Sequence, residues 1–179
     1  MLIKKTKIAD CFVINAKKTF DSRGYFQRIF CNKEIKFKTK QVNISSNYKK
    51  GTLRGFHYQK LPSKENKIIT CISGEIFNVV VDMRVGSKTY KKIFSIKLCE
   101  KDNKMLKIPA GCANCFLTLE KNTKILYFME DFYKPQKNIG FNYRSFDSAI
   151  KWPHAIKVIN QKDYKLPKLL RVNNKPNSQ

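Results

Sequence analysis

Short strands follow one another through most of this chain, and this succession limits the folds that it can adopt. Strand-like segments recur at spacings of roughly 8–12 residues, with Gly, Pro and Asn turns between them, which is typical of a β-sandwich or small barrel. The predicted strands cover residues 3–14, 25–30, 41–45, 67–71, 75–84, 92–99, 115–119 and 124–132. We expect an all-β, antiparallel jelly roll, although periodicity alone also fits an immunoglobulin-like sandwich.

Helices are expected only in short pieces. Residues 33–40 fit either a short helix or a loop, residues 141–153 fit a loop with a short helix, and residues 161–166 fit a helical turn before Pro167. Residues 1–167 form a single predicted domain. Residues 168–179, which are mostly polar, are predicted to form a frayed C-terminal tail.

The net charge of +24 comes from a diffuse excess of lysine. Arginine accounts for six of the 37 basic residues, and the 31 lysines form no block along the chain. Proteins that bind nucleic acid specifically concentrate positive charge on one face and favour arginine, whose planar fork matches phosphates and base edges. We therefore expect no specific nucleic-acid partner. The charge would still speed the arrival of a small phosphorylated substrate.

The composition also limits metals, disulfides and membranes. With only two histidines, the chain cannot build a histidine-rich metal site, and the pair Cys112 and Cys115 lacks a second ligand pair. The six cysteines are predicted to be buried free thiols. No apolar run approaches the roughly 18 residues that span a bilayer, and the N-terminus carries charges where a signal peptide is apolar. We expect a cytoplasmic protein with no membrane partner and no histidine-rich metal site.

One of the two histidines, His57, lies in the most informative segment, GTLRGFHYQ at residues 51–59. Gly51 and Gly55 indicate tight turns or close approach of a ligand. Arg54 lies three residues before His57, and an odd spacing on a regular strand predicts opposite faces. A second polar pattern occurs at residues 41–45, where one strand face carries polar residues and the other is apolar. Its polar side chains are those of Gln41, Asn43 and Ser45.

The segment at residues 51–59 resembles the histidine motif of the dTDP-4-dehydrorhamnose 3,5-epimerases. Further matches follow in the same order as in that family: DSRGYF at 21–26, QVNIS at 41–45, GEIFNVVVD at 74–82, IPAG at 108–111 and QKD at 161–163. The aromatic residues at 127–133 and IKWP at 150–153 are also similar. The resemblance runs from about residue 8 to 167 and implies a cupin-like jelly roll, a homodimer and no cofactor.

The resemblance implies a catalytic set of four residues. His57 matches the base that removes a proton next to the ketone of a 4-keto sugar, and Asp163 matches the carboxylate that orients this imidazole. Tyr127 matches the residue that returns a proton on the other face. Lys67 matches the cation near the developing enolate oxygen, where positive charge stabilises the transition state.

The resemblance also implies residues that bind the substrate. Arg23 and Arg54 match arginines that hold the diphosphate, and Tyr133 matches a residue near the nucleotide and sugar. Polar contacts would come from Gln41, Asn43, Ser45 and Gln59. Two positions depart from the family pattern: Asn114 replaces a pocket histidine and cannot titrate, and Arg28 occupies a position that is often acidic. We predict that both of these border the substrate.

The leading hypothesis is therefore an epimerase for surface-polysaccharide synthesis. It would invert C3 and C5, or C3 alone, of a dTDP- or GDP-linked 4-keto hexose or heptose through an enolate. Two alternatives stay open: a non-catalytic jelly roll that binds sugar nucleotides, and a 3,4-ketoisomerase on the same fold.

Overall fold

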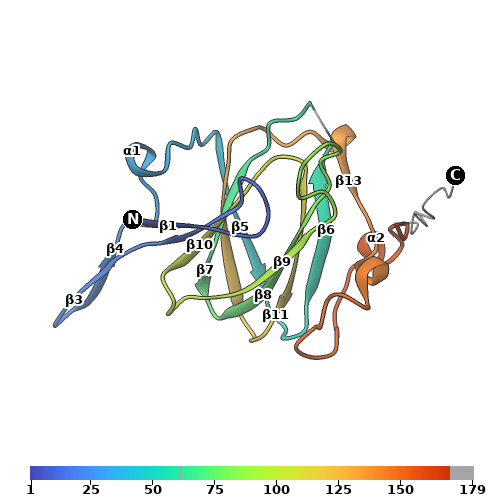
Figure 1. The fold of residues 1–179 in the computed structure, drawn as a ribbon. Helices are drawn as coiled ribbons and strands as arrows, with labels where there is room; N and C mark the ends of the chain where they lie inside the picture. The colour runs from blue at the N-terminus through green and yellow to red at the C-terminus, as the bar shows by residue number, and fades with distance from the viewer. Residues whose placement is uncertain (61, 170–179) are drawn as a thin grey trace, which may run out of the picture.

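The computed structural model describes residues 1–60 and 62–169, which form two antiparallel sheets packed face to face (Figure 1). The six-stranded sheet has the order β1 (Leu2–Lys5), β2 (Phe12–Asn15), β10 (Lys104–Ile108), β7 (Lys67–Ser73), β12 (Thr123–Met129) and β5 (Gln41–Asn47). The five-stranded sheet has the order β13 (Asn138–Gly140), β6 (Leu53–Gln59), β11 (Cys112–Thr118), β8 (Glu75–Asp82) and β9 (Ile93–Cys99). The predicted all-β jelly roll is confirmed.

A separate hairpin and a few short helices complete the described chain. Strands β3 (Lys18–Asp21) and β4 (Gly24–Gln27) form a two-stranded arm that projects from the body of the molecule (Figure 1). The helices are α1 (Asn32–Ile35), η1 (Pro135–Lys137), η2 (Tyr143–Phe146) and α2 (Gln161–Tyr164). Of the predicted polar tail, all but residues 168 and 169 lies outside the described residues.

The main core lies between the two sheets. Ile69 and Ile125 of the six-stranded sheet and Val80 and Phe116 of the five-stranded sheet belong to this cluster of buried side chains. The outer face of the five-stranded sheet is covered by a second cluster that includes Phe141 and neighbouring residues up to 159. The segment that leads to α2 is therefore fastened to the barrel by apolar contacts.

Several predicted strands have different limits in the structure. Residues 3–14 form the hairpin of β1 and β2 instead of one strand, and β4 ends at Gln27 instead of continuing to residue 30. Strands β3, β10 and β13 were not predicted. Strand β10 shows no alternation because Met105 and Leu106 are both buried, one against the cluster under α1 and the other in the main core. The prediction that all cysteines are buried is also wrong, since Cys31 and Cys99 are half-buried.

Strand β5 has the predicted alternation, but its apolar face is not covered. Val42 is 52% exposed and Ile44 is 62% exposed, because β5 forms an edge of its sheet and no segment within residues 1–60 and 62–169 packs over that face. The opposite face turns Asn43 and Ser45 towards a cavity between the sheets. The strand was expected to bury one face, and the face that meets the interior is the polar one.

A bulge in β6 overturns the prediction that Arg54 and His57 lie on opposite faces. His57 pairs with Asn114 and Arg54 pairs with Phe116, so two residues of β6 oppose the single residue between them on β11. The extra residue shifts the alternation by one position, and Arg54 and His57 both line the cavity. The inserted pair contains Gly55, whose φ is +119° and whose added Cβ would lie 2.5 Å from the carbonyl oxygen of Asn114.

Replacing Gly55 with alanine should therefore lower the free energy of unfolding by more than about 2 kcal/mol, because strain at positive φ is combined with a clash against backbone. Thermal unfolding measures this loss. The control is Gly86→Ala, where φ is +88° but nothing lies within 4 Å of the added Cβ. Equal losses of unfolding free energy in the two variants would show that the close approach of Gly55 to β11 does not contribute to the cost of the substitution.

Candidate active site

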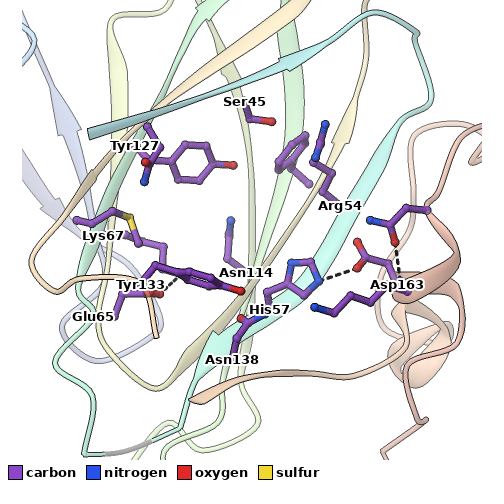
Figure 2. A pocket seen from close by; sticks show the side chains of 15 residues that line it. Ser45, Arg54, His57, Glu65, Lys67, Asn114, Tyr127, Tyr133, Asn138 and Asp163 are labelled. Carbon is purple, nitrogen blue, oxygen red and sulfur yellow. Dashed lines mark hydrogen bonds and ion pairs between the residues drawn. The ribbon is translucent and has the colours of Figure 1, made fainter. Parts of the chain in front are cut away.

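A cavity of about 420 Å³ lies between the two sheets, and most of its lining side chains are polar. It is lined by Asn43, Ser45, Arg54, His57, Glu65, Lys67, Asn114, Phe116, Tyr127, Met129, Tyr133, Asn138, Asn160, Lys162 and Asp163. Figure 2 shows His57 and Asp163 on one side of the cavity, Tyr127 and Lys67 across from them, and Asn114 between. All four residues predicted to be catalytic therefore line one cavity.

His57 and Asp163 form a hydrogen-bonded pair between segments that are far apart in the sequence. Nε2 of His57 lies 2.8 Å from Oδ1 of Asp163, and Oδ2 of Asp163 accepts the backbone N–H of Gly55 at 3.1 Å. The side chain of Asp163 is 2% exposed, whereas that of His57 is 36% exposed. A carboxylate at Nε2 favours the tautomer that carries its proton there, which leaves Nδ1 free to accept a proton.

The surroundings of Asp163 keep it ionised. Burial raises the pKa of this carboxyl, but the hydrogen bond and charge of His57 and the N–H of Gly55 outweigh burial, so the pKa lies below its ordinary value. Asn160 fixes the backbone, because its side-chain oxygen accepts the N–H of Asp163 at 2.6 Å at the start of α2. The carboxylate is thus charged and held in place.

Tyr127 is suited to donate a proton. Its side chain comes from β12, and burial raises the pKa of the phenol well above its ordinary value, an effect that the positive charge of Arg54 only partly offsets. The hydroxyl therefore stays protonated at neutral pH.

Lys67 carries a second charge into the cavity and is paired with an acidic residue. Its Nζ lies 2.8 Å from Oε1 of Glu65, and the two side chains are 10% and 7% exposed. The side-chain amide of Gln59 donates to the other oxygen of Glu65, and Ser63 donates to Gln59 at 3.0 Å. This chain of bonds restricts the ammonium group of Lys67 to one part of the cavity.

Arg54 is positioned by an amide below it. Its Nε donates to Oδ1 of Asn47 at 2.8 Å, and Nδ2 of Asn47 donates to the backbone carbonyls of Ser45 and Thr123. One edge of the guanidinium is therefore fixed to β5 and β12, while the side chain lines the cavity. A fixed guanidinium is suited to bind phosphate oxygens in a bidentate manner.

The residues predicted to bind substrate divide into two groups. Asn43, Ser45, Asn114 and Tyr133 line the cavity together with Arg54. Gln41 and Gln59 lie behind it, since Gln41 accepts the backbone N–H of Tyr133 and Gln59 supports Glu65.

Arg23 and Arg28 lie outside the cavity of their own chain. Arg23 is at the tip of the β3–β4 arm, 88% exposed and paired with Asp21 at 2.7 Å. Arg28 follows the arm and pairs with Glu34 at 3.2 Å. Arg23 was expected to hold the diphosphate and Arg28 to border the substrate, but neither lines the cavity of its own chain. Figure 1 shows the arm projecting from the body of the molecule.

The sequence analysis missed several residues of the cavity, namely Glu65, Phe116, Met129, Asn138, Asn160 and Lys162. Glu65 lies between strands in a segment without periodicity. In the sequence, Glu65 is marked only by its position two residues before Lys67. Because acidic residues are few in this chain, 13 in all, that position was the one available signal. Asn160 had a clearer signal, because an Asn placed before a predicted helical turn is a common N-cap.

Within residues 1–60 and 62–169, no group of three or more His, Cys, Asp or Glu side chains is arranged to hold a metal ion. No helix in that part of the chain has the length and apolar character needed to cross a membrane.

Comparison with known proteins gives consistent matches over most of the chain. The family model described as dTDP-4-dehydrorhamnose 3,5-epimerase matches residues 5–171. The dTDP-4-dehydrorhamnose 3,5-epimerase of Sinorhizobium fredii is 34% identical over 175 residues, which is 94% of this chain and 90% of the relative.

Solved structures agree with the sequence matches. The dTDP-4-dehydrorhamnose 3,5-epimerase from Bacillus anthracis, crystallised with TDP and PPi bound, has a TM-score of 0.90 at 29% identity and covers 94% of this chain and 99% of its own. A 3'-monoepimerase from Streptomyces bikiniensis in complex with dTDP-quinovose has a TM-score of 0.85 at 26% identity, with 91% and 85% covered.

The lowered pKa of Asp163 predicts how stability depends on pH. Because the folded pKa lies below the unfolded one, the stabilisation by Asp163 is complete above about pH 4 and is lost as the pH falls through the folded pKa. Melting temperatures of the parent and of Asp163→Asn should differ by a constant amount above about pH 4, and the difference should narrow as the pH falls below that value. Asp147→Asn, at an exposed carboxylate, is the control. A difference that stays constant below about pH 4 as well would contradict the charged pair.

Proposed function

The chain belongs to the dTDP-4-dehydrorhamnose 3,5-epimerase family, and on that premise we propose that it epimerises a dTDP-linked 4-keto sugar at C3 and C5, or at C3 alone. The observation that carries the proposal is the arrangement in one cavity of a His57–Asp163 pair with Tyr127 and Lys67 across from it. Such a set can remove a proton from one face of a sugar and supply one on the other.

His57 acts as the base. A ketone at C4 acidifies the C–H bonds at C3 and C5, and Nδ1 of His57 accepts the proton while Nε2–H donates to Asp163. The imidazolium that forms is stabilised by the buried carboxylate, which holds the ring in one orientation.

Lys67 stabilises the enolate that results. Its ammonium group lies across the cavity from His57, where it can donate a hydrogen bond to the C4 oxygen as negative charge develops there. Interactions that strengthen on going to the transition state accelerate the reaction, and a charged donor in a cavity with little water is among the strongest. Glu65 restricts the position of this donor.

Tyr127 returns the proton on the opposite face. Its raised pKa keeps the hydroxyl protonated, and Figure 2 shows the ring pointing into the cavity from the side away from His57. Protonation of the planar enolate by Tyr127 inverts the carbon from which His57 took its proton. Each proton transfer in this account is assigned to a side chain of the protein.

The reaction is tested by incubation with dTDP-4-keto-6-deoxyglucose in D2O, with NMR detection of deuterium at C3 and C5. We expect exchange with inversion in the parent enzyme and a loss of at least about 100-fold in His57→Asn, because a general base contributes about 10²–10⁴-fold. In Tyr127→Phe, the sugar should still take up deuterium on the face that meets His57, but inversion of the carbon should be slow.

The same NMR spectra separate the alternative functions. A 3,4-ketoisomerase would move the carbonyl to C3, whereas an epimerase leaves it at C4. A non-catalytic binding protein would bind dTDP in calorimetry without any exchange. Undiminished exchange by His57→Asn would overturn the assignment of the base. A GDP-linked 4-keto sugar, run in parallel, tests the preference for thymidine.

We extend the proposal to a homodimer in which the β3–β4 arm of one chain reaches the cavity of the other. Phe20 and Phe26 on the arm are 71% and 73% exposed, and the apolar face of the edge strand β5 is uncovered, with Ile44 62% exposed. Apolar surface of this extent on an arm and a sheet edge favours association with a second copy. Arg23 at the tip would then bind the diphosphate in the partner cavity.

Mixed dimers test this arrangement. Arg23→Ala and His57→Asn each damage a different part of the shared site, so a mixed dimer keeps one intact cavity. Co-expression of the two chains should restore about one quarter of the parent activity in a two-fold symmetric dimer with random assortment. Activity no higher than that of the separately purified variants would contradict sharing of the arm, and light scattering checks the dimer independently.

A further inference from the structure

Two buried amide side chains, Asn114 in the cavity lining and Asn78 behind it, have polar atoms without hydrogen-bond partners. Neither Nδ2 nor Oδ1 of Asn78 has a partner among the described residues, and the same is true of Oδ1 of Asn114. Asn78 is 0% exposed and Asn114 is 8% exposed. Buried polar groups are nearly always hydrogen-bonded to protein or ordered water, so three such atoms close together require an explanation.

The register of the strands places the two amides on one face. On β8 and β11, Asn78 pairs with Phe116 and Asn114 pairs with Val80, so the two asparagines are diagonal neighbours whose side chains point the same way. That face is the interior one, because Phe116 and Val80 belong to the core cluster between the sheets. Asn114 also pairs with His57 on its other side, which places it beside the base.

Folding alone does not account for these residues. A buried polar atom that has lost its water without gaining a partner costs about 1–3 kcal/mol, and buried apolar residues of the main core, Ile76, Val80 and Phe116, lie beside Asn78 on this face. An apolar side chain of the same size would avoid this cost. The amides are therefore suited to a polar group that enters the cavity from outside.

The chemistry of the site identifies the group as a hydroxyl. The unpartnered atoms comprise acceptors on both residues and a donor on Asn78, and neither side chain carries a charge. A carboxylate or phosphate would leave the acceptors unmatched, whereas a hydroxyl both donates and accepts. Two of the charged groups of the cavity are already paired, His57 with Asp163 and Lys67 with Glu65.

We propose that Asn114 and Asn78 form a hydroxyl-binding subsite in the cavity floor. Oδ1 of Asn114 accepts the hydrogen of one sugar hydroxyl, and an ordered water links that hydroxyl to Asn78, which lies deeper in the fold. The proposal rests on the proposed function, since it takes the ligand to be a nucleotide-linked sugar. It adds that this enzyme prefers sugars that keep this hydroxyl over the corresponding deoxy sugars.

The experiment uses binding, so that it does not depend on turnover. Calorimetry is run with dTDP, dTDP-glucose and the 2-, 3- and 6-deoxy analogues of dTDP-glucose, none of which has a ketone to react. The proteins are the parent and two near-isosteric variants, Asn114→Leu and Asn78→Leu. Thr39→Val is the matched control, because it removes an unpartnered hydroxyl that does not line the cavity.

We expect Asn114→Leu to weaken the binding of dTDP-glucose by about tenfold, because one hydrogen bond to the sugar is lost. The Kd of dTDP should stay within about twofold of its value for the parent. One deoxy analogue should bind the parent about tenfold more weakly than dTDP-glucose does and should show no further loss with Asn114→Leu. Such non-additivity identifies the hydroxyl that contacts the amide. Asn78→Leu should show a smaller loss with the same pattern, and Thr39→Val should bind every ligand as the parent does.

For every analogue, the loss of affinity caused by Asn114→Leu could simply add to the loss caused by removing the hydroxyl. That result would overturn the subsite, because the amide and the hydroxyls would then act independently. An equal weakening of dTDP and dTDP-glucose would overturn it as well. Asn78→Leu also removes polar atoms from an apolar cluster, so the folded protein should be recovered and its melting temperature recorded. If the sugars bind with this pattern while the D2O experiment shows no exchange, the epimerase proposal fails and the subsite stands.

Discussion

The single extra residue in β6 is the constraint on which the site depends. Without the bulge between Arg54 and His57, strand alternation would turn one of them out of the cavity, and the imidazole would be separated from the guanidinium. Gly55 makes the bulge possible, since only a residue without Cβ fits against the carbonyl of Asn114. The same residue offers its N–H to Asp163, so one irregularity of the backbone places the base and also helps to place its carboxylate.

The charges of the cavity are arranged in pairs that cross between elements. His57 of β6 is joined to Asp163 of α2, and Lys67 of β7 is joined to Glu65 in the preceding loop. Pairing keeps buried charges ionised, and it also restricts the positions of long side chains. Such fixed dipoles and charges stabilise a transition state without having to reorganise, which is the condition under which electrostatic catalysis is most effective.

The sequence predicted the fold class and the four catalytic candidates better than it predicted their surroundings. Alternation at residues 41–45 predicted β5, but it could not show that Val42 and Ile44 would be left uncovered, because coverage depends on other segments or on a second chain. The prediction that Arg54 and His57 lie on opposite faces of the strand was wrong, because a bulge leaves no simple periodic signal in the sequence. Glu65 was missed because a loop residue acquires its role only from the three-dimensional neighbour that it meets. Arg23 likewise lies at an exposed tip, where its side chain contacts Asp21 and no residue of the cavity.

The carboxylate that orients His57 is carried by α2, a short helix held to the barrel by the cap at Asn160 and by apolar contacts of the preceding segment. The barrel supplies Arg54, Lys67 and Tyr127 without any help from this helix. In the proposed mechanism, ligand binding therefore depends on residues of the two sheets, whereas proton abstraction depends in addition on the docking of α2, which brings Asp163 to His57.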